Sequence, residues 1–271
     1  MQGIHHFIDT DVKAAYLNLL LAVGFDTLDF GSFVSPKAIP QLRDTREVLE
    51  KLDLSVSKTK LLAIVANLRG VEEAVVYPEI SYLGFPFSIS ETFQQRNTNS
   101  SIAQSLDTVK RMLDLCDTAG KEAAVYLSMG FGNPYGDEWT EDIMLARAEE
   151  LIGCGVKILS LADTTGVSTP TQIRRLLPLL SEAFKETEIG LHLHSTPAER
   201  KEKIAAALDS GCRRVDSALK GFGGCPMAAD DLTGNIATEA VISMLEDRNI
   251  DTGLDMDKWQ EALLYSTKVF L

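Results

Sequence analysis

Two histidines separated by one residue are the first candidates for chemistry in this sequence. His192 and His194 lie in the short apolar stretch 189–195, which has the pattern of a β-strand. Side chains two apart on a strand share a face and lie roughly 7 Å apart along it, so both imidazoles can converge on one ion. A pair of half-exposed strand residues would give the same pattern. A divalent metal site is therefore a hypothesis that the rest of the chain must support.

Other polar side chains stand at or just beyond the ends of predicted strands. They are Asp29, Ser32, Asn67, Ser160 and Asp163. Asn235 follows later, after the last strand and its glycine-rich segment and before a helix. Imidazole, carboxylate and amide oxygen together form a ligand set that suits Mg²⁺ or Mn²⁺, with Zn²⁺ or Co²⁺ as alternatives. Two members have plainer interpretations, because Asp163 begins a good turn sequence and Asn235 precedes a helix that it could cap. Their joint placement favours the metal site.

A glycine-rich segment, residues 220–226, follows the last predicted strand. Its three glycines, Gly221, Gly223 and Gly224, could form a phosphate cradle or only a tight turn. Cys225 lies beside them in a segment able to swing over a substrate, where a thiol can deliver a proton or act as nucleophile while water is excluded. We expect a structural role for the other three cysteines, Cys116, Cys154 and Cys212. No CxxC pair occurs, which indicates a reduced compartment.

The elements that position these residues follow a repeated pattern. At four places an amphipathic helix stops at a glycine and an apolar β-rich run begins: Gly24, Gly120, Gly155 and Gly211. Such alternation predicts βα units around a parallel sheet. Thr169 before Pro170 is a predicted helix start, and so is Thr196 before Pro197, where Glu199 completes a capping box.

Seven strands are predicted: 25–33, 60–66, 75–84, 122–129, 157–163, 188–194 and 213–219. Polar residues at so many carboxyl ends favour a (β/α)8 TIM barrel over an open doubly wound sheet. Eight strands are needed to close such a barrel, so the first would precede Met1. We expect one barrel domain over 1–271, lacking its first strand and with Met1 an internal methionine of a longer protein.

Charge and hydropathy exclude several classes of partner. The chain has 26 basic and 39 acidic residues, a net charge of −13, and no long basic run, so nucleic acid is not an expected partner. Its longest apolar run, 19–23, is too short to span a bilayer, and residues 1–6 carry no basic region followed by an apolar stretch. We expect a cytoplasmic protein that acts on a small molecule.

Six ordered segments resemble hydroxymethylglutaryl-CoA lyase, a family of metal-dependent TIM-barrel carbon–carbon lyases. They are residues 32–37, 67–70, 160–167, 192–194, 221–226 and 234–239. The resemblance implies that His192, His194 and Asn235 bind the metal and that Cys225 works on a mobile loop. It also places Ser32, Ser160, Asp163 and Glu239 in or near the pocket.

The implied substrate is the coenzyme A thioester of 3-hydroxy-3-methylglutarate, cleaved to acetyl-CoA and acetoacetate. A cation touching the tertiary hydroxyl would ease loss of its proton, a carboxylate or imidazole would accept that proton, and Cys225 could protonate the carbanion. Asp29 and Asp163 are the candidate catalytic carboxylates, and Asn67 is a candidate substrate-binding residue beside Ser32, Ser160 and Glu239.

The sequence also departs from the family pattern. The family has an Arg-Asp pair, a metal ligand and an enolate-stabilising group, just before the position of Met1. Asp29 stands where Glu is usual, and Ser195 where Asp is common. Two alternatives therefore stay open: a synthase that condenses acetyl-CoA with a 2-oxo acid, and a non-catalytic barrel. An unpaired sheet edge favours self-association, as in a homodimer.

Overall fold

The sheet of this protein is parallel and curls around an axis. The structure, a computed structural model, describes residues 1–2, 4, 6–224 and 233–270. Its strands are β1 (Thr27–Ser32), β2 (Lys60–Ile64), β3 (Ile80–Ser88), β4 (Glu122–Ser128), β5 (Ile158–Ala162), β6 (Glu188–His192) and β7 (Val215–Asp216). All neighbours pair in parallel, and the order in the sheet is the order in the chain. This confirms the predicted TIM-barrel class with seven strands.

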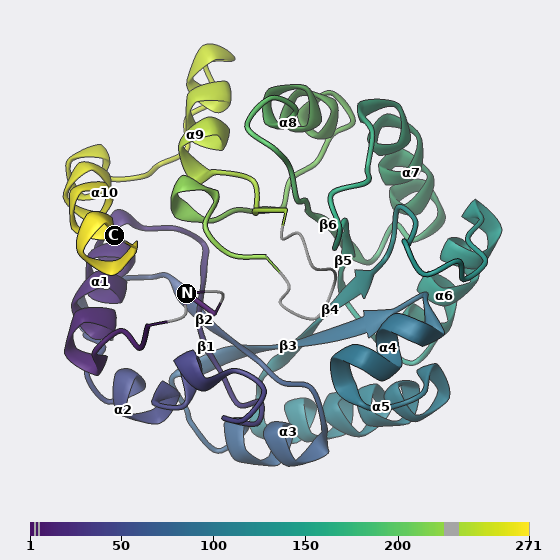
Figure 1. The fold of residues 1–271 in the computed structure, drawn as a ribbon, viewed down its shortest axis with the longest axis horizontal. Helices are drawn as coiled ribbons and strands as arrows, with labels where there is room; N and C mark the ends of the chain where they lie inside the picture. The colour runs from purple at the N-terminus through teal and green to yellow at the C-terminus, as the bar shows by residue number, and fades with distance from the viewer. Residues whose placement is uncertain (3, 5, 225–232, 271) are drawn as a thin grey trace.

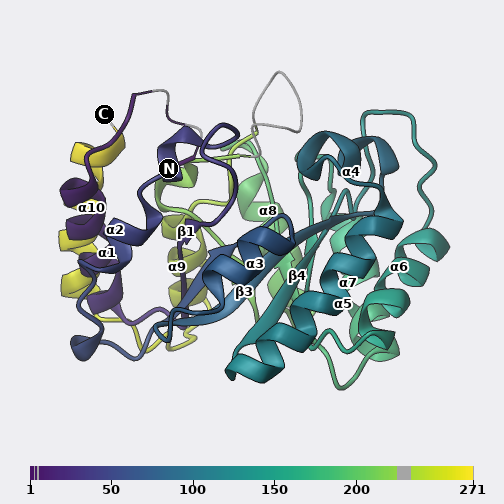
Figure 2. The same cartoon turned by 90° about the horizontal axis from the view of Figure 1, so that it is seen from below.

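The described residues form ten α-helices, which lie in a ring around the sheet (Figure 1). They are α1 (Thr10–Val23), α2 (Thr45–Leu49), α3 (Leu68–Ala74), α4 (Glu91–Thr98), α5 (Ile102–Ala119), α6 (Glu141–Gly153), α7 (Pro170–Ala183), α8 (Arg200–Asp209), α9 (Thr238–Asp247) and α10 (Met256–Phe270). Short 3₁₀ turns occupy Pro40–Leu42, Leu54–Val56 and Leu219–Gly221. Seen from the side, the long helices run alongside the strands (Figure 2).

Local sequence signals account for most of the helix ends. Gly24 and Gly120 end α1 and α5 in the left-handed conformation that glycine adopts without a steric cost. Thr169 caps α7 in a capping box with Gln172, as its sequence predicts.

Several boundary predictions were wrong. The last strand was predicted over 213–219 but spans only Val215–Asp216. Thr196 does not start a helix. Its hydroxyl donates a hydrogen bond to the Glu199 carboxylate at 2.9 Å within a turn, and α8 begins at Arg200. The third strand was predicted over 75–84, but it begins at Ile80 because α3 runs to Ala74 and a turn with Pro78 follows. It then continues through Pro86 to Ser88, because β4 pairs with it over Tyr82–Ser88.

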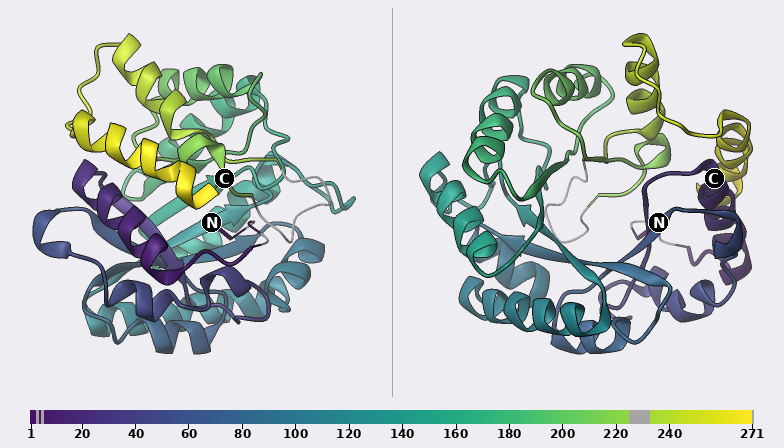
Figure 3. Two further views of the ribbon diagram at one scale, coloured as in Figure 1. Left: turned by 60° about the vertical axis from the view of Figure 1, so that its left-hand side comes forward. Right: turned by 180° about the vertical axis from the view of Figure 1, so that it is seen from behind.

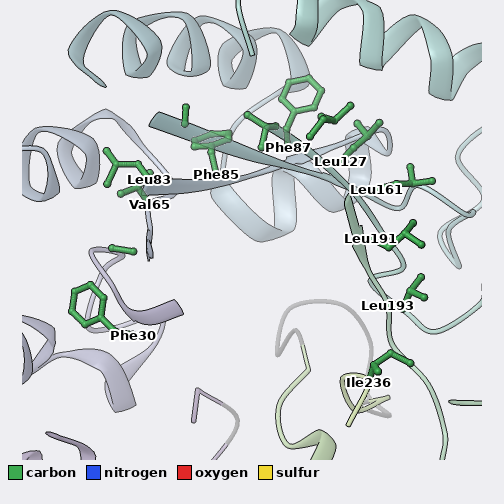
Figure 4. Close-up of a cluster of buried hydrophobic side chains, with 14 of the residues drawn as sticks. Phe30, Val65, Leu83, Phe85, Phe87, Leu127, Leu161, Leu191, Leu193 and Ile236 are labelled. Atoms are coloured by element: carbon green, nitrogen blue, oxygen red, sulfur yellow. The ribbon is translucent and has the colours of Figure 1, made fainter. Parts of the chain in front are cut away.

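Alternate residues of each strand face the helices or the barrel interior. The outward side chains form the main core and follow the curve of the sheet (Figure 4); among them are Leu83, Phe85, Phe87, Leu127, Leu161 and Leu191. A separate small cluster of Leu62, Tyr82, Ala124 and Ile158 comes from the opposite faces of β2 to β5. Apolar residues thus fill part of the interior, and the polar candidates lie further along the strands.

The first and last helices lie side by side (Figure 3), and the rings of Tyr16 and Phe270 meet edge to face at 5.7 Å. Beneath α1, the buried ammonium of Lys13 donates hydrogen bonds to the carboxylate of Asp44, at 2.6 Å, and to the carbonyl of Gln41.

None of the helices in the described part of the chain has the length and apolar character that a membrane span requires.

Candidate active site

The two histidines face each other at the carboxyl end of β6. Nε2 of His192 lies 3.3 Å from Nε2 of His194, and the ring centroids are 5.3 Å apart. Two nitrogens that bind one ion at about 2.1 Å and at right angles are about 3 Å apart, so this spacing fits adjacent ligands of a single cation. The predicted convergence of the two imidazoles is confirmed as geometry.

Asp216 and Tyr126 orient the ring of His192. β7 pairs His192 with Asp216 in register, and the Asp216 carboxylate lies 3.2 Å from Nδ1 of His192. Because an ionised carboxylate only accepts, Nδ1 carries the proton and Nε2 keeps its lone pair. The ring of Tyr126 meets the imidazole edge to face at 5.5 Å. The sequence-based site list missed Asp216, because it lies in the middle of the predicted strand 213–219, whereas the observed strand β7 ends at Asp216.

His194 is enclosed by protein and held through its backbone. Its exposed fraction is 3%, and burial, together with the neighbouring His192, lowers the pKa of the His194 imidazole to about 3. The ring is therefore neutral at pH 7, which is the state that binds metals. An antiparallel bridge joins His194 to Asn235, and Ser195 N–H donates to the Gly234 carbonyl at 2.9 Å.

The amide of Asn235 is oriented by the glycine loop. Its Nδ2 donates to the Phe222 carbonyl at 3.1 Å, which leaves Oδ1 as the atom able to bind a cation. Gly223 has a φ of 107°, and a Cβ there would lie 2.7 Å from Nδ2 of Asn235. The described part of the loop, up to Gly224, therefore packs directly on the Asn235 segment, and glycine at 223 permits this approach. Cys225 lies outside the described residues.

Asp29 completes a group of acidic and aromatic side chains near the histidines. It lies on β1 with its side chain exposed to solvent, although many protein atoms lie close to its carboxyl. The surrounding protein and the carboxylate of Asp216 raise the pKa of Asp29 to about 7. Such a value suits a group that exchanges a proton near neutral pH.

Asp163 is buried, in contrast to Asp29, with an exposed fraction of 1%. Its carboxylate accepts from Ser168 N–H at 3.1 Å, from the Ser168 hydroxyl at 2.5 Å and from the Lys203 ammonium at 3.1 Å. These hydrogen bonds hold the loop after β5, so Asp163 has the turn-forming role that its sequence also allows. Its carboxylate is therefore hydrogen-bonded to groups inside the protein.

The other candidates also have local partners. Ser160 is buried on β5 beside Gly190, where an added Cβ would lie 3.0 Å from its hydroxyl, so it shares the inner face with His192. Ser32 accepts from Val34 N–H at 3.2 Å within the loop after β1. Asn67 caps α3 through Gly70 N–H at 2.9 Å.

Glu239 lies in the first turn of α9 and accepts the Lys220 N–H with both carboxylate oxygens, at 3.0 and 2.9 Å. It therefore anchors the start of the glycine loop.

The structure brings the segments of His192, His194 and Asn235 together, and Asp216 lies beside His192. Within the described ranges, no cluster of three His, Cys, Asp or Glu side chains is arranged as a metal site.

A parallel α/β barrel with convergent imidazoles at its strand ends belongs to the large class of TIM-barrel enzymes. Within this class the chain belongs to the HMGL-like family, whose model matches residues 1–263. This confirms the family predicted from the six sequence segments.

Similar proteins of known name are lyases. Hydroxymethylglutaryl-CoA lyase YngG of Bacillus subtilis is 34% identical over 256 residues, which are 94% of this chain and 85% of that protein. The crystal structure of the B. subtilis HMG-CoA lyase superposes with a TM-score of 0.90 at 32% identity and covers 98% of this chain and 89% of that one. An Acinetobacter baumannii HMG-CoA lyase, solved with coenzyme A and 3-methylmalate, gives a TM-score of 0.88 at 30% identity, with 97% and 85% covered.

Proposed function

We propose that this protein cleaves the coenzyme A thioester of 3-hydroxy-3-methylglutarate to acetyl-CoA and acetoacetate, with a divalent cation bound by His192, His194 and Asn235. The relatives named above carry this activity in their names, and one was solved with coenzyme A. The observation in this chain that supports the proposal most is the 3.3 Å separation of the two Nε2 atoms.

The donor set of this chain fits such a cation. Two neutral imidazoles and one amide oxygen suit Mg²⁺ or Mn²⁺ when carboxylate or substrate oxygens complete the shell, and Zn²⁺ or Co²⁺ are further candidates. The cation would supply positive charge beside the substrate's hydroxyl and carbonyl oxygens. In the neutral ring of His192, the contact with Asp216 holds the proton at Nδ1, so the lone pair lies at Nε2.

The reaction needs a base and an acid. Removal of the tertiary hydroxyl proton lets the bond between C2 and C3 break, which releases acetoacetate and leaves the enolate of acetyl-CoA to be protonated at carbon. Asp29, with its pKa raised to about 7, is our candidate for the group that accepts the hydroxyl proton. Cys225 is the candidate proton donor to the carbanion, on the strength of the sequence resemblance.

The other candidates then have supporting roles. Asp163 and Glu239 hold the loops after β5 and β7, because their carboxylates are engaged by Ser168 and Lys220. Ser160 is buried on the inner face of β5, paired with Gly190 two residues before His192, where it can support the wall of the substrate site. Ser32 and Asn67 shape the loops that follow β1 and β2.

The direct test is product analysis with Mn²⁺ or Mg²⁺ present. The protein should release acetoacetate and acetyl-CoA in equal amounts from the hydroxymethylglutaryl thioester, and release neither from the 3-methylglutaryl thioester, which lacks the hydroxyl. His192→Ala should lower the rate at least about 100-fold, whereas the exposed His6→Ala should retain it. Full activity in His192→Ala would contradict the assignment, and condensation of acetyl-CoA with pyruvate instead would favour the synthase alternative.

A further inference from the structure

A buried lysine lies directly behind the histidine pair. Lys203 in α8 is 1% exposed, and its ammonium donates to three acceptors: Oδ2 of Asp163 at 3.1 Å, the Gly166 carbonyl at 2.9 Å and the His194 carbonyl at 2.9 Å. An ammonium has three N–H donors, so every donor is used. The acceptors come from the end of β5, the loop after it and the segment that follows β6.

We propose that Lys203 is a positioning residue for His194, and through it for the metal centre of the proposed function. The peptide after His194 is fixed twice, because its carbonyl accepts from Lys203 and its N–H, from Ser195, donates to Gly234. The peptide before His194 is fixed by the Leu193 carbonyl, which accepts from Ile236 N–H at 3.1 Å. The backbone that carries the imidazole is therefore held on both sides. Little freedom remains for the ring to turn away from His192.

The anchor behind Lys203 is itself rigid. Asp163 has a side chain that is 0% exposed, and the Ser168 amide and hydroxyl hold its two oxygens. Lys203 cannot shift without breaking this network, so the position of the loop after β5 is transmitted to the position of His194. A buried ion pair adds little net stability compared with a well-packed apolar pair, whereas its geometry is strongly fixed. These features support a positioning role over simple stabilisation.

The chain offers a matched control in a second buried lysine. Lys13 is also 1% exposed and bonds Asp44 at 2.6 Å and the Gln41 carbonyl, but it ties α1 to the segment before α2. The contacts of Lys13 do not include a residue of the histidine site in the described chain. Loss of either lysine removes a comparable buried ion pair, so only a positioning role predicts different effects on the histidines.

The experiment compares Lys203→Met with Lys13→Met in two measurements. In metal-free protein, long-range ¹H–¹⁵N spectra report the ring nitrogens of His192 and His194, and we expect the His194 signals to move in Lys203→Met alone. In the second measurement, Mn²⁺ titration followed by electron paramagnetic resonance should show affinity about 10- to 100-fold weaker in Lys203→Met. Lys13→Met should lower the melting temperature but keep the Mn²⁺ affinity within about twofold of the parent.

Unchanged ring signals and unchanged Mn²⁺ affinity in Lys203→Met would overturn the proposal, and so would equal changes in both variants. If Lys203→Met does not fold, Ser168→Ala loosens Asp163 while keeping the ammonium, and a smaller change of the same kind is expected; no change there counts against the proposal. If the parent protein binds no Mn²⁺, the metal dependence fails, and the metal-free spectra still decide whether Lys203 positions His194.

Discussion

Asp216 and His192 occupy paired positions on β7 and β6, and the carboxylate lies 3.2 Å from Nδ1 of the imidazole. The sheet register places the orienting group directly beside the ring that it orients. The contact with Asp216 therefore fixes the orientation of the His192 ring, with Nε2 toward His194. Substitution of Asp216 can change this orientation without removing His192 or His194, the two proposed ligands.

Asp216→Asn should weaken Mn²⁺ binding about 10- to 100-fold, because an amide holds the Nδ1 proton less firmly than a carboxylate does. Calorimetric titration with Mn²⁺ measures the effect. Asp209→Asn is a suitable control, since Asp209 forms ion pairs with Arg174 and Arg248 on the outer helices. Equal affinities in parent and Asp216→Asn would show that the contact does not orient the ligand.

The buried imidazole of His194 should make the metal-free protein sensitive to acid. Its pKa is about 3 in the folded state against about 6.5 in an unfolded chain, so the unfolded state binds the proton first as the pH falls. Stability from this group is complete above pH 6.5 and falls by up to about 1.4 kcal/mol per pH unit between 6.5 and 3. Urea unfolding at pH 7, 6 and 5 measures the slope. His194→Gln should flatten it, and an unaltered slope would assign the acid sensitivity to other groups.

Asp29 should have the opposite effect on stability. Its pKa, about 7 in the folded state, lies above the usual value of an aspartate, so the folded state holds the proton between pH 4 and 7. The stability of the metal-free protein should therefore fall as the pH rises through this range. Asp29→Asn should raise the melting temperature at pH 8 by about 1 to 2 °C, a modest effect because the side chain is open to solvent. Calorimetry measures the melting temperature, and a lower value in Asp29→Asn would contradict this prediction. An activity assay should show loss of lyase activity in the same variant.

Gly223→Ala should displace Asn235, because the new methyl group would lie 2.7 Å from its amide nitrogen. We expect a stability loss of about 1 kcal/mol or more from the left-handed backbone, and in addition weaker Mn²⁺ binding. Gly24→Ala separates the two effects, since Gly24 has a φ of 88° and no neighbouring atom within 4 Å of the added carbon. Similar Mn²⁺ affinity in both variants would mean that the clash does not reach Asn235.

Periodicity and turn chemistry predicted the fold well because each βα unit has local signals. The Gly24 and Gly120 helix ends and the Thr169 cap depend only on neighbouring residues, so the sequence contains them in full. Thr196 has the same local chemistry, but its hydroxyl and Glu199 stabilise a turn, because the chain must first pass from the end of β6 to the outer ring. Tertiary position decided between two local structures that the same residues allow.

The candidate site was predictable where one strand carries it, and less so where several segments meet. His192 and His194 share a strand face, so their convergence followed from spacing alone. Asp216 and Lys203 reach the site through strand register and helix packing, which a single sequence does not display. Asp163 was recognised as polar and well placed, but its burial against Lys203 depends on a contact across 40 positions.

The matching order of strands in chain and sheet has a consequence for how the protein is made. Each new βα unit can dock on the preceding one as the polypeptide leaves the ribosome, since neighbouring strands are never separated by a later segment. His192, His194 and Asn235 belong to the last third of the chain, so a nascent polypeptide lacks the complete set until synthesis has passed position 235. If these residues bind the proposed ion, its capture would be a late event of maturation and would fasten the last units to a sheet that has already formed.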